Sequence, residues 1–285
     1  MAPTRQDPRV SLDSVSVRTV QEAIVEVALK LNRPGWSSYL VGGTLRDLLV
    51  GADSRHRGVE PRDVDIIVGG ASREQLQDVL REALVLERLT RFGGLHLSKR
   101  LSSGSRVLFD IWTLSDTWGF RWQNITPRIE DFPGTTFLNI DACAIELLQP
   151  PGRQRGLFAK GFFEGIANRV MDVNYVPNPY PYVCVARALV LAARLNFTIT
   201  RPLAEFILLQ TATGGIDALI EAQQSHYGMV RCDARELGMW LHQIRRQFDS
   251  RQRAIGIEVS RARYLELWRD YPIAGDSRSH PRAST

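Results

Sequence analysis

The spacing of hydrophobic residues changes character about halfway along the chain. Up to about residue 150, short apolar runs alternate with amphipathic segments, which predicts strands, some in hairpin-like pairs, interspersed with helices. From about residue 165 the apolar positions follow helical spacing almost throughout. We therefore predict an α+β fold, with a head over residues 17–160 and a helical domain over residues 161–272. The polar segments 1–16 and 273–285 are expected to be a flexible N-terminus and a disordered tail.

Local patterns predict the individual elements of the head. Residues 17–32 and 72–87 have helical spacing, and the second helix has Ser72 as N-cap with Gln75 in the capping-box position. The segment SSYLVGG predicts a strand, and TLRDLLVG a short helix with Thr44 as N-cap. Further strands are expected at DVDIIVGG, FGGLHLSKRL, SRVLFDIWTL and TFLNIDACAIELL (136–148).

Aspartates occupy predicted strands that are otherwise apolar. Asp63 and Asp65 are two residues apart, so they share one face of their strand, while Asp110 interrupts the apolar run RVLFDIWTL. Carboxylates on one strand face repel one another, and burying them without a cation costs free energy. A cation of the Mg²⁺ type would compensate, because it prefers carboxylate oxygens and commonly also binds substrate phosphates. Asp63, Asp65 and Asp110 therefore form a candidate two-metal site; the alternative is a strand end with solvated acids.

A glycine pair precedes the short helix and favours the metal interpretation. Gly42 and Gly43 follow a strand, where backbone amides and the start of the next helix can hold a phosphate group. Arg46 lies in the first turn of that helix and is predicted to reach a triphosphate. Asp47 is expected to pair with Arg46 or to help cap the helix.

The segment VGGTLRDLLVG followed by RDVDIIV resembles the head-domain signature of the tRNA nucleotidyltransferases (CCA-adding enzymes) and bacterial poly(A) polymerases. A weaker similarity continues through VARALVLAARLNFTI (185–199). The resemblance implies a nucleotidyltransferase fold, a small mixed sheet flanked by helices. It also implies that Asp63, Asp65 and Asp110 bind metal, and that Gly42, Gly43 and Arg46 bind the phosphates of the incoming nucleotide.

Two family motifs are missing. The arginines of RRDFTINA are absent from GTTFLNIDA (134–142), where Asp141 replaces the family asparagine. The base-reading EDxxR motif would fall at YPYVC (180–184), which contains none of its polar residues. Their loss argues against programmed addition of C and then A. Tyr180 and Tyr182 are left as candidates for base stacking or for packing.

The intervening segment and the acids near it leave alternatives open. Trp112, Trp118 and Trp122 are interleaved with arginines, a pattern typical of a nucleic-acid platform or of a loop that caps the sheet. Asp131 and Asp141 are candidates for a general base or for structural partners of arginine. His56 and His96 are isolated in the sequence and suggest no hydrolase triad.

Composition narrows the classes of function. The net charge is +5, and Lys30, Lys99 and Lys160 are the only lysines, so the basic surface is rich in arginine. Guanidinium groups suit phosphate-bearing partners. Three widely spaced cysteines support neither a zinc site nor a disulfide framework. Without a secretory signal or an uninterrupted apolar run of about 18 residues, we predict a cytoplasmic protein without a membrane partner.

These observations predict a Mg²⁺-dependent nucleotidyltransferase. It would transfer a nucleoside monophosphate from an NTP to an acceptor hydroxyl, with RNA bearing a tRNA-like 3′ end as the expected acceptor, and release pyrophosphate. The alternatives are transfer to a protein acceptor and a non-catalytic descendant that binds nucleotide or RNA.

Overall fold

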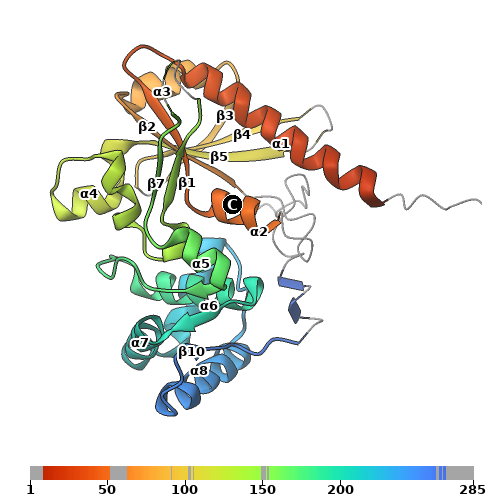
Figure 1. Ribbon diagram of the computed structural model, residues 1–285, viewed down its shortest axis with the longest axis vertical. Helices are drawn as coiled ribbons and strands as arrows, with labels where there is room; N and C mark the ends of the chain where they lie inside the picture. The colour runs from red at the N-terminus through yellow and green to blue at the C-terminus, as the bar shows by residue number, and fades with distance from the viewer. Residues whose placement is uncertain are drawn as a thin grey trace, which may run out of the picture.

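The structure is a computed structural model of the 285-residue chain (Figure 1). It describes residues 9–51, 63–90, 92–101, 104, 106–148, 152, 154–260, 263–264 and 266–267. The predicted disordered tail, residues 1–8 of the predicted flexible N-terminus, and residues 52–62 before Asp63 lie outside the described residues.

Helices and strands alternate in the first half of the chain, and helices dominate the second. The helices are α1 (Arg9–Leu31), α2 (Gly42–Gly51), α3 (Arg73–Leu80), α4 (Trp118–Gln123), α5 (Phe162–Asn168), α6 (Pro181–Leu195), α7 (Arg201–Tyr227) and α8 (Ala234–Asp249), with 3-10 helices η2 (Leu114–Asp116), η3 (Ile129–Thr135) and η4 (Asn139–Asp141). The strands are β1 (Ser37–Val41), β2 (Asp63–Gly69), β3 (Val85–Leu89), β4 (Leu95–Arg100), β5 (Arg106–Thr113), β6 (Cys143–Glu146), β7 (Leu157–Ala159), β8 (Val170–Met171), β9 (Thr198–Thr200) and β10 (Ala254–Ile255).

The described strands of the first half form one mixed sheet. Its order is β3-β4-β5-β2-β1-β6-β7. Neighbours pair antiparallel except β2 and β5, which run parallel in the middle of the sheet. In that parallel pair Asp65 lies directly opposite Asp110. The two predicted acidic strands are therefore neighbours, although the β3–β4 hairpin separates them in the sequence.

The two faces of this sheet differ in what covers them. Helices α1 and α3 cover one face (Figure 1) and bury Val64, Ile66 and Val68 of β2 together with Leu76 and Leu80 of α3. Because side chains alternate along a strand, Asp63 and Asp65 point to the opposite face. A second cluster, which includes Tyr39, Ile67, Phe120 and Phe132, covers part of that opposite face. The acids therefore lie on the face that α1 and α3 leave uncovered.

The helical part lies below the sheet in Figure 1 and has its own core. Helices α6, α7 and α8 surround the short sheet β10-β9-β8, and most of α6 is buried. This core also includes Val50 from α2 and Phe137 from the segment before η4. Helix α2, which begins with the glycine pair, is thus in contact with both parts of the molecule. The predicted domain boundary at residue 160 stays a prediction.

Most predicted elements of the head are present, with several differences in their bounds. The capping box of Ser72 and Gln75 is confirmed, but α3 ends at Leu80 and residues 85–87 belong to strand β3. Helix α1 begins at Arg9 rather than at residue 17. In the predicted strand 136–148, only Cys143–Glu146 is a strand, because η4 turns the chain just before it.

Thr44 and the last sheet also depart from the predictions. Thr44 does not cap α2, which begins at Gly42. Its hydroxyl instead accepts a hydrogen bond from the Asp65 amide (2.9 Å) and donates one to the Asp63 carbonyl (3.1 Å). The sheet β10-β9-β8 lies in a region where helical spacing alone was expected. Its strands have only two or three residues, too few for an alternating pattern to be recognised.

Helix α7 is, by length and composition alone, apolar enough to cross a membrane, with a window of mean hydropathy 1.3. It has a kink at Gly215, whose backbone is not helical. Neither piece on its own reaches the roughly 20 residues that a membrane span requires. Its first half contributes Leu203, Phe206 and Ile207 to the helical core. These contacts fit a core helix, and the absence of a membrane partner stays a prediction.

Gly70, directly after β2, offers a test of the turn that ends this strand. Its φ is +80°, and a Cβ there would lie 2.1 Å from the Gly35 carbonyl oxygen, which belongs to the backbone and cannot move aside cheaply. We expect Gly70→Ala to lower the free energy of unfolding by more than about 2 kcal/mol, from strain and clash together. Gly134→Ala is the matched control, because its Cβ would meet no atom within 4 Å, and it should change stability by less than about 1 kcal/mol. Urea unfolding of both variants measures the difference, and equal losses would contradict it.

Candidate functional site

Three carboxylates converge at the β2–β5 pair. Asp63 and Asp65 share one face of β2, and Asp110 lies opposite Asp65 on β5. The side chains of Asp63 and Asp65 are half-buried, and that of Asp110 is 25% exposed. Parallel pairing brings the Asp65 and Asp110 side chains side by side on the face not covered by α1 and α3. The structure therefore brings together the three acids predicted from the sequence.

The electrostatics of Asp65 reflect this crowding. Burial raises the pKa of Asp65 well above its usual value, and the negative charges of Asp63 and Asp110 raise it further. The positive charge of Arg187 opposes this shift in the pKa but does not reverse it. Without a cation, the site thus disfavours the fully ionised state. A bound cation would remove that penalty.

His96 contacts the third carboxylate. It lies opposite Asp110 in the β4–β5 pairing, and its Nδ1 is 2.5 Å from Asp110 Oδ1. The sequence showed His96 as isolated, because its partner lies on the other strand of the hairpin. The antiparallel register of that hairpin is the signal that would have found it. His56 lies outside the described residues.

The glycine pair lies against the acids. Gly42 has φ +62°, and a Cβ there would be 3.6 Å from Asp65 Oδ2. A Cβ at Gly43 would be 3.1 Å from Arg46 Nη2. Thr44 links the first turn of α2 to β2 through its two hydrogen bonds to the Asp63 and Asp65 backbone. The start of α2 is thus fixed beside the carboxylates, the position that a phosphate loop requires.

Arg46 is buried beneath this loop rather than exposed above it. Only 2% of it is exposed. Its Nε donates to Asp47 Oδ1 (2.8 Å), and Nη1 donates to Asp141 Oδ1. Asp141 also accepts from Arg187 Nη2 (2.9 Å). These contacts use Arg46 to hold two buried carboxylates, so the phosphate contact predicted for it stays a prediction.

The network extends into the helical part. Arg194 of α6, fully buried, donates from Nη2 to Asp47 Oδ1 at 2.8 Å. Burial alone raises the pKa of Asp47, but Arg194 and Arg46 outweigh it, so its pKa is lowered. The same holds for Asp141, where Arg187 and Arg46 overcome the effect of burial. Asp141 is buried and accepts hydrogen bonds from two arginines, which favours the structural alternative over the general base.

The donor set fits a hard divalent cation, although the side chains are not arranged around one. Among the described residues, no three His, Cys, Asp or Glu side chains are close enough to enclose a metal ion. The chemistry of the set nevertheless suits Mg²⁺: three carboxylates, two of them half-buried, with the pKa of Asp65 raised by burial and by the neighbouring acids. Magnesium binding stays a prediction.

Two of the remaining candidates, Trp112 and Tyr182, pack against the protein. Trp112 packs on the sheet cluster, and its Nε1 donates to Thr117 Oγ1 at 3.0 Å. Tyr182 packs on α7, where a Cβ at Gly214 would lie 2.4 Å from its ring. Asp131 is exposed on η3. The three cysteines are buried, and burial raises their thiol pKa to about 11 for Cys143 and about 12 for Cys184 and Cys232, so none is an activated nucleophile.

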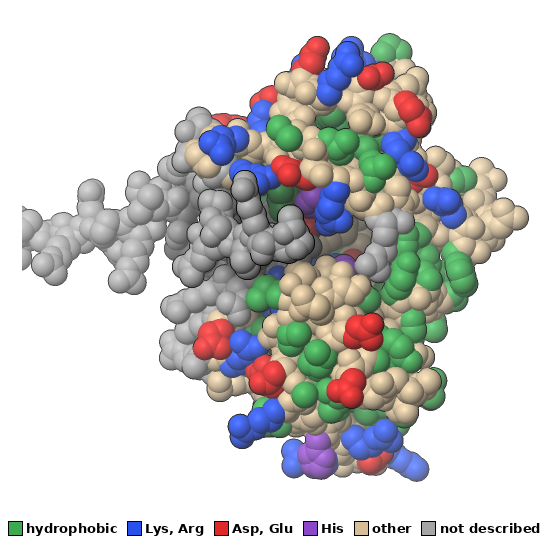
Figure 2. Space-filling view, turned by 180° about the vertical axis from the view of Figure 1, so that it is seen from behind, with side chains coloured by type: hydrophobic (Ala, Val, Ile, Leu, Met, Phe, Trp, Pro, Cys, Tyr) green, Lys and Arg blue, Asp and Glu red, His purple; other side chains and the backbone are tan. Residues whose placement is uncertain are grey.

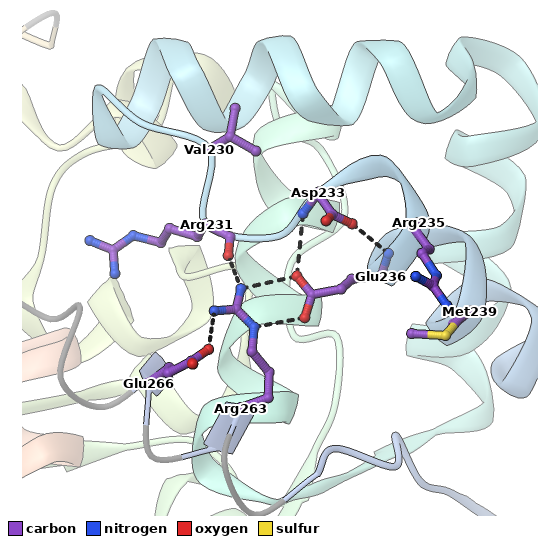
Figure 3. A pocket seen from close by; sticks show the side chains of 8 residues that line it. All are labelled: Val230, Arg231, Asp233, Arg235, Glu236, Met239, Arg263 and Glu266. Carbon is purple, nitrogen blue, oxygen red and sulfur yellow. Dashed lines mark hydrogen bonds and ion pairs between the residues drawn. The ribbon is translucent and has the colours of Figure 1, made fainter.

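Two surface cavities lie apart from the carboxylates. One, of about 500 Å³, lies between α5 and β8. The other, of about 490 Å³, lies at the start of α8, where Arg263 binds Glu236 through two nitrogens (2.7 and 3.0 Å) and Glu266 through a third (3.1 Å; Figure 3). Its central cation is therefore already paired. Figure 2 shows, in addition, a hollow at mid-height between the sheet-bearing half and the helical half of the molecule.

Comparison with solved structures identifies the fold. No family model and no curated protein matches the sequence. A structure described as "tRNA-processing enzyme (apo form I)" matches at TM-score 0.52 and 20% identity, covering 92% of this chain and 60% of its own. A CCA-adding enzyme with CTP matches at TM-score 0.52 and 21% identity (86% and 53%). A tRNA nucleotidyltransferase with a primer tRNA and an ATP analog matches at TM-score 0.50 and 20% identity (86% and 60%).

These matches establish the fold. The α+β class, with a nucleotidyltransferase head and a following helical part, is confirmed, and the resemblance inferred from the sequence is confirmed at the level of the fold. The chain spans about 53 to 60% of the length of the three structures named above.

Proposed function

We propose that the chain is a Mg²⁺-dependent nucleotidyltransferase, a divergent relative of the CCA-adding enzymes, acting on RNA. The observation that carries the proposal is the placement of Asp65 opposite Asp110 on parallel neighbouring strands, with Asp63 on the same face and Gly42 against Asp65. Metal binding would explain why three acids share one face of the sheet although burial and the charges of Asp63 and Asp110 raise the pKa of Asp65.

The proposed reaction joins an acceptor hydroxyl to the α-phosphate of an NTP. The hydroxyl oxygen attacks the α-phosphorus, pyrophosphate leaves with the electrons of the broken bond, and the hydroxyl proton passes to solvent. Bound Mg²⁺ would neutralise charge on the entering and leaving oxygens. Asp63, Asp65 and Asp110 would hold it, and the backbone at Gly42 and Gly43 would hold the phosphates. Arg46 would support the loop from beneath through its pairs with Asp47 and Asp141.

A second candidate is a non-catalytic descendant that binds nucleotide or RNA. The missing RRD and EDxxR motifs favour it, as does the contact of His96 with an oxygen of Asp110. Transfer to a protein hydroxyl is a further possibility for the same site. The nucleotide preference and the cytoplasmic location stay predictions.

One experiment separates these functions. The protein is incubated with each labelled NTP, Mg²⁺ and total RNA, beside an Asp63→Ala/Asp65→Ala control. We expect the wild type to label RNA and the control to label nothing. Equal absence of transfer in both would refute the enzyme, and label on protein would refute the RNA acceptor.

A further inference from the structure

Four aromatic side chains from separate segments meet at the protein surface. They are Phe92, before β4; Trp118, at the start of α4; and Tyr175 and Tyr180, between β8 and α6. Ring centroids lie 6.5 Å apart for Phe92–Trp118, 5.8 Å for Phe92–Tyr180 and 5.7 Å for Trp118–Tyr175, within the range in which aromatic rings attract one another. Phe92 and Tyr180 are each 38% exposed. We call these four residues the aromatic platform.

The turn that carries Phe92 is held tightly in place. A Cβ at Gly93 would lie 2.5 Å from Arg73 Nη2, and a Cβ at Gly94 would lie 3.1 Å from the Trp112 Cβ. Arg73 also donates to Asp116 Oδ2 at 3.2 Å, just before α4. Gly93 and Gly94 therefore pack against the Arg73 side chain and β5, next to Phe92.

The platform flanks the carboxylate site. Phe92 lies four residues before His96, which contacts Asp110. Tyr180 is the N-cap of α6, and Arg187, seven residues on, contacts Asp141 and affects the pKa of Asp65. At 1.5 Å per residue, that separation along α6 is about 10 Å. A strand lying on the platform can therefore place its end near the acids.

Aromatic and cationic side chains continue from the platform along α4. Trp118, Arg121 and Trp122 are spaced i, i+3 and i+4, so they share one face of the helix. Trp122 is 61% exposed, and the Arg121 side chain is equally exposed, 3.7 Å from Asp116. A ligand that suits this surface has flat faces for stacking and negative charges along its length. Single-stranded nucleic acid has both.

We propose that the aromatic platform binds the unpaired bases of a single-stranded RNA by stacking and directs its 3′ end to the carboxylates. The proposal rests on the proposed function for the role of that end, but the binding itself requires neither metal nor NTP. Stacking on aromatic rings tolerates any base, so this mode of binding requires no polar side chains that recognise particular bases.

The test measures binding in EDTA without NTP. Fluorescence anisotropy is recorded with a labelled single-stranded RNA of about 12 nucleotides, within the usual size of such sites, and with a duplex of equal length. We expect Phe92→Ala/Tyr180→Ala to weaken single-strand binding roughly 5- to 150-fold. Tyr180→Phe keeps the ring and should bind like the wild type. Phe163→Ala is the matched control, an exposed aromatic side chain on α5, and should also leave binding unchanged.

Several outcomes would overturn the platform. They are unchanged binding in Phe92→Ala/Tyr180→Ala, an equal loss in Phe163→Ala, or duplex bound as tightly as single strand. A loss of NTP binding with RNA binding unchanged would assign the platform to the incoming base instead. Asp63→Ala/Asp65→Ala should bind RNA normally, so RNA binding through the platform without nucleotidyl transfer would refute the proposed function alone. Transfer to RNA that the platform variants leave unaffected would refute the platform alone.

Discussion

Replacing Asp65 by asparagine is expected to abolish nucleotidyl transfer while making the metal-free protein more stable. The carboxyl group of Asp65 is half-buried opposite Asp110, and burial and its acidic neighbours raise its pKa. An amide of the same size removes the repelled charge, so the folded state gains free energy. It also removes a metal ligand, and the loss of several kcal/mol of charge stabilisation lowers the rate roughly 10³-fold or more.

The pH dependence of this gain has a definite sign. Because the folded pKa of Asp65 is raised, the folded protein holds the proton more tightly than the unfolded chain does. The contribution of Asp65 to stability is therefore fully present below its usual pKa of 3.8 and is lost as the pH rises through the raised value. The stability gain of Asp65→Asn should be largest at neutral pH and should vanish on acidification.

Thermal unfolding in EDTA and in Mg²⁺ measures the stability gain and the loss of the metal ligand, and the labelled-NTP assay measures the loss of transfer. Mg²⁺ should raise the Tm of the wild type and leave that of Asp65→Asn unchanged. Asp78→Asn is the control, since Asp78 is exposed on α3 and remote from the acids, and it should behave like the wild type. A metal-free Asp65→Asn protein less stable than the wild type at neutral pH would contradict the account of its burial.

The acids of the site could be predicted because each of them interrupts a local pattern. Asp63, Asp65 and Asp110 are charged residues in apolar strands, and period-2 alternation places the first two on one face without knowledge of the fold. A local pattern does not show which strands will be neighbours in the sheet. The parallel β2–β5 pairing spans an intervening hairpin, so the register that places Asp65 opposite Asp110 became known only from the structure.

The side chains that support the site could not be predicted for the same reason. His96, Arg187 and Arg194 have partners 14, 46 and 147 residues away in the chain. Arg46 lies next to the glycines, which suggested a phosphate ligand, but long-range pairing with Asp141 draws its side chain into the interior. Sequence proximity to a loop does not determine the direction in which a long side chain points.

Two bounds of elements were wrong because tertiary pairing overrode local spacing. Residues 85–87 have helical periodicity, yet Val85–Leu89 pairs with β4 and extends the sheet. The segment before Cys143 is apolar enough for a strand, but Asn139 binds the backbone of Asp172 and Val170 through its side chain, which bends the chain into η4. In both places a distant segment supplies the hydrogen bonds that decide the structure.

Replacing Arg194 by methionine is expected to destabilise the protein by about 3 to 5 kcal/mol, because it leaves a buried carboxylate without one of its two cations. Asp47 is 3% exposed and accepts from both Arg194 and Arg46. Since α2 carries Asp47 and α6 carries Arg194, the pair joins the glycine loop to the helical part. The loss should therefore appear in both stability and nucleotide binding.

Urea unfolding compares this variant with a surface control and a double replacement. Arg81→Ala breaks an exposed pair, with Asp78 at 3.4 Å, and should cost less than about 1 kcal/mol. Asp47→Leu/Arg194→Met removes both charges and should recover much of the loss, because no unpaired ion remains buried.

The lowered pKa of Asp47 determines how this deficit changes with pH. The pair stabilises the wild type above the usual pKa of 3.8, and this contribution is lost as the pH falls through the lowered value. The deficit of Arg194→Met should therefore shrink in acid, and a deficit independent of pH would show that lost packing, not charge pairing, is its cause.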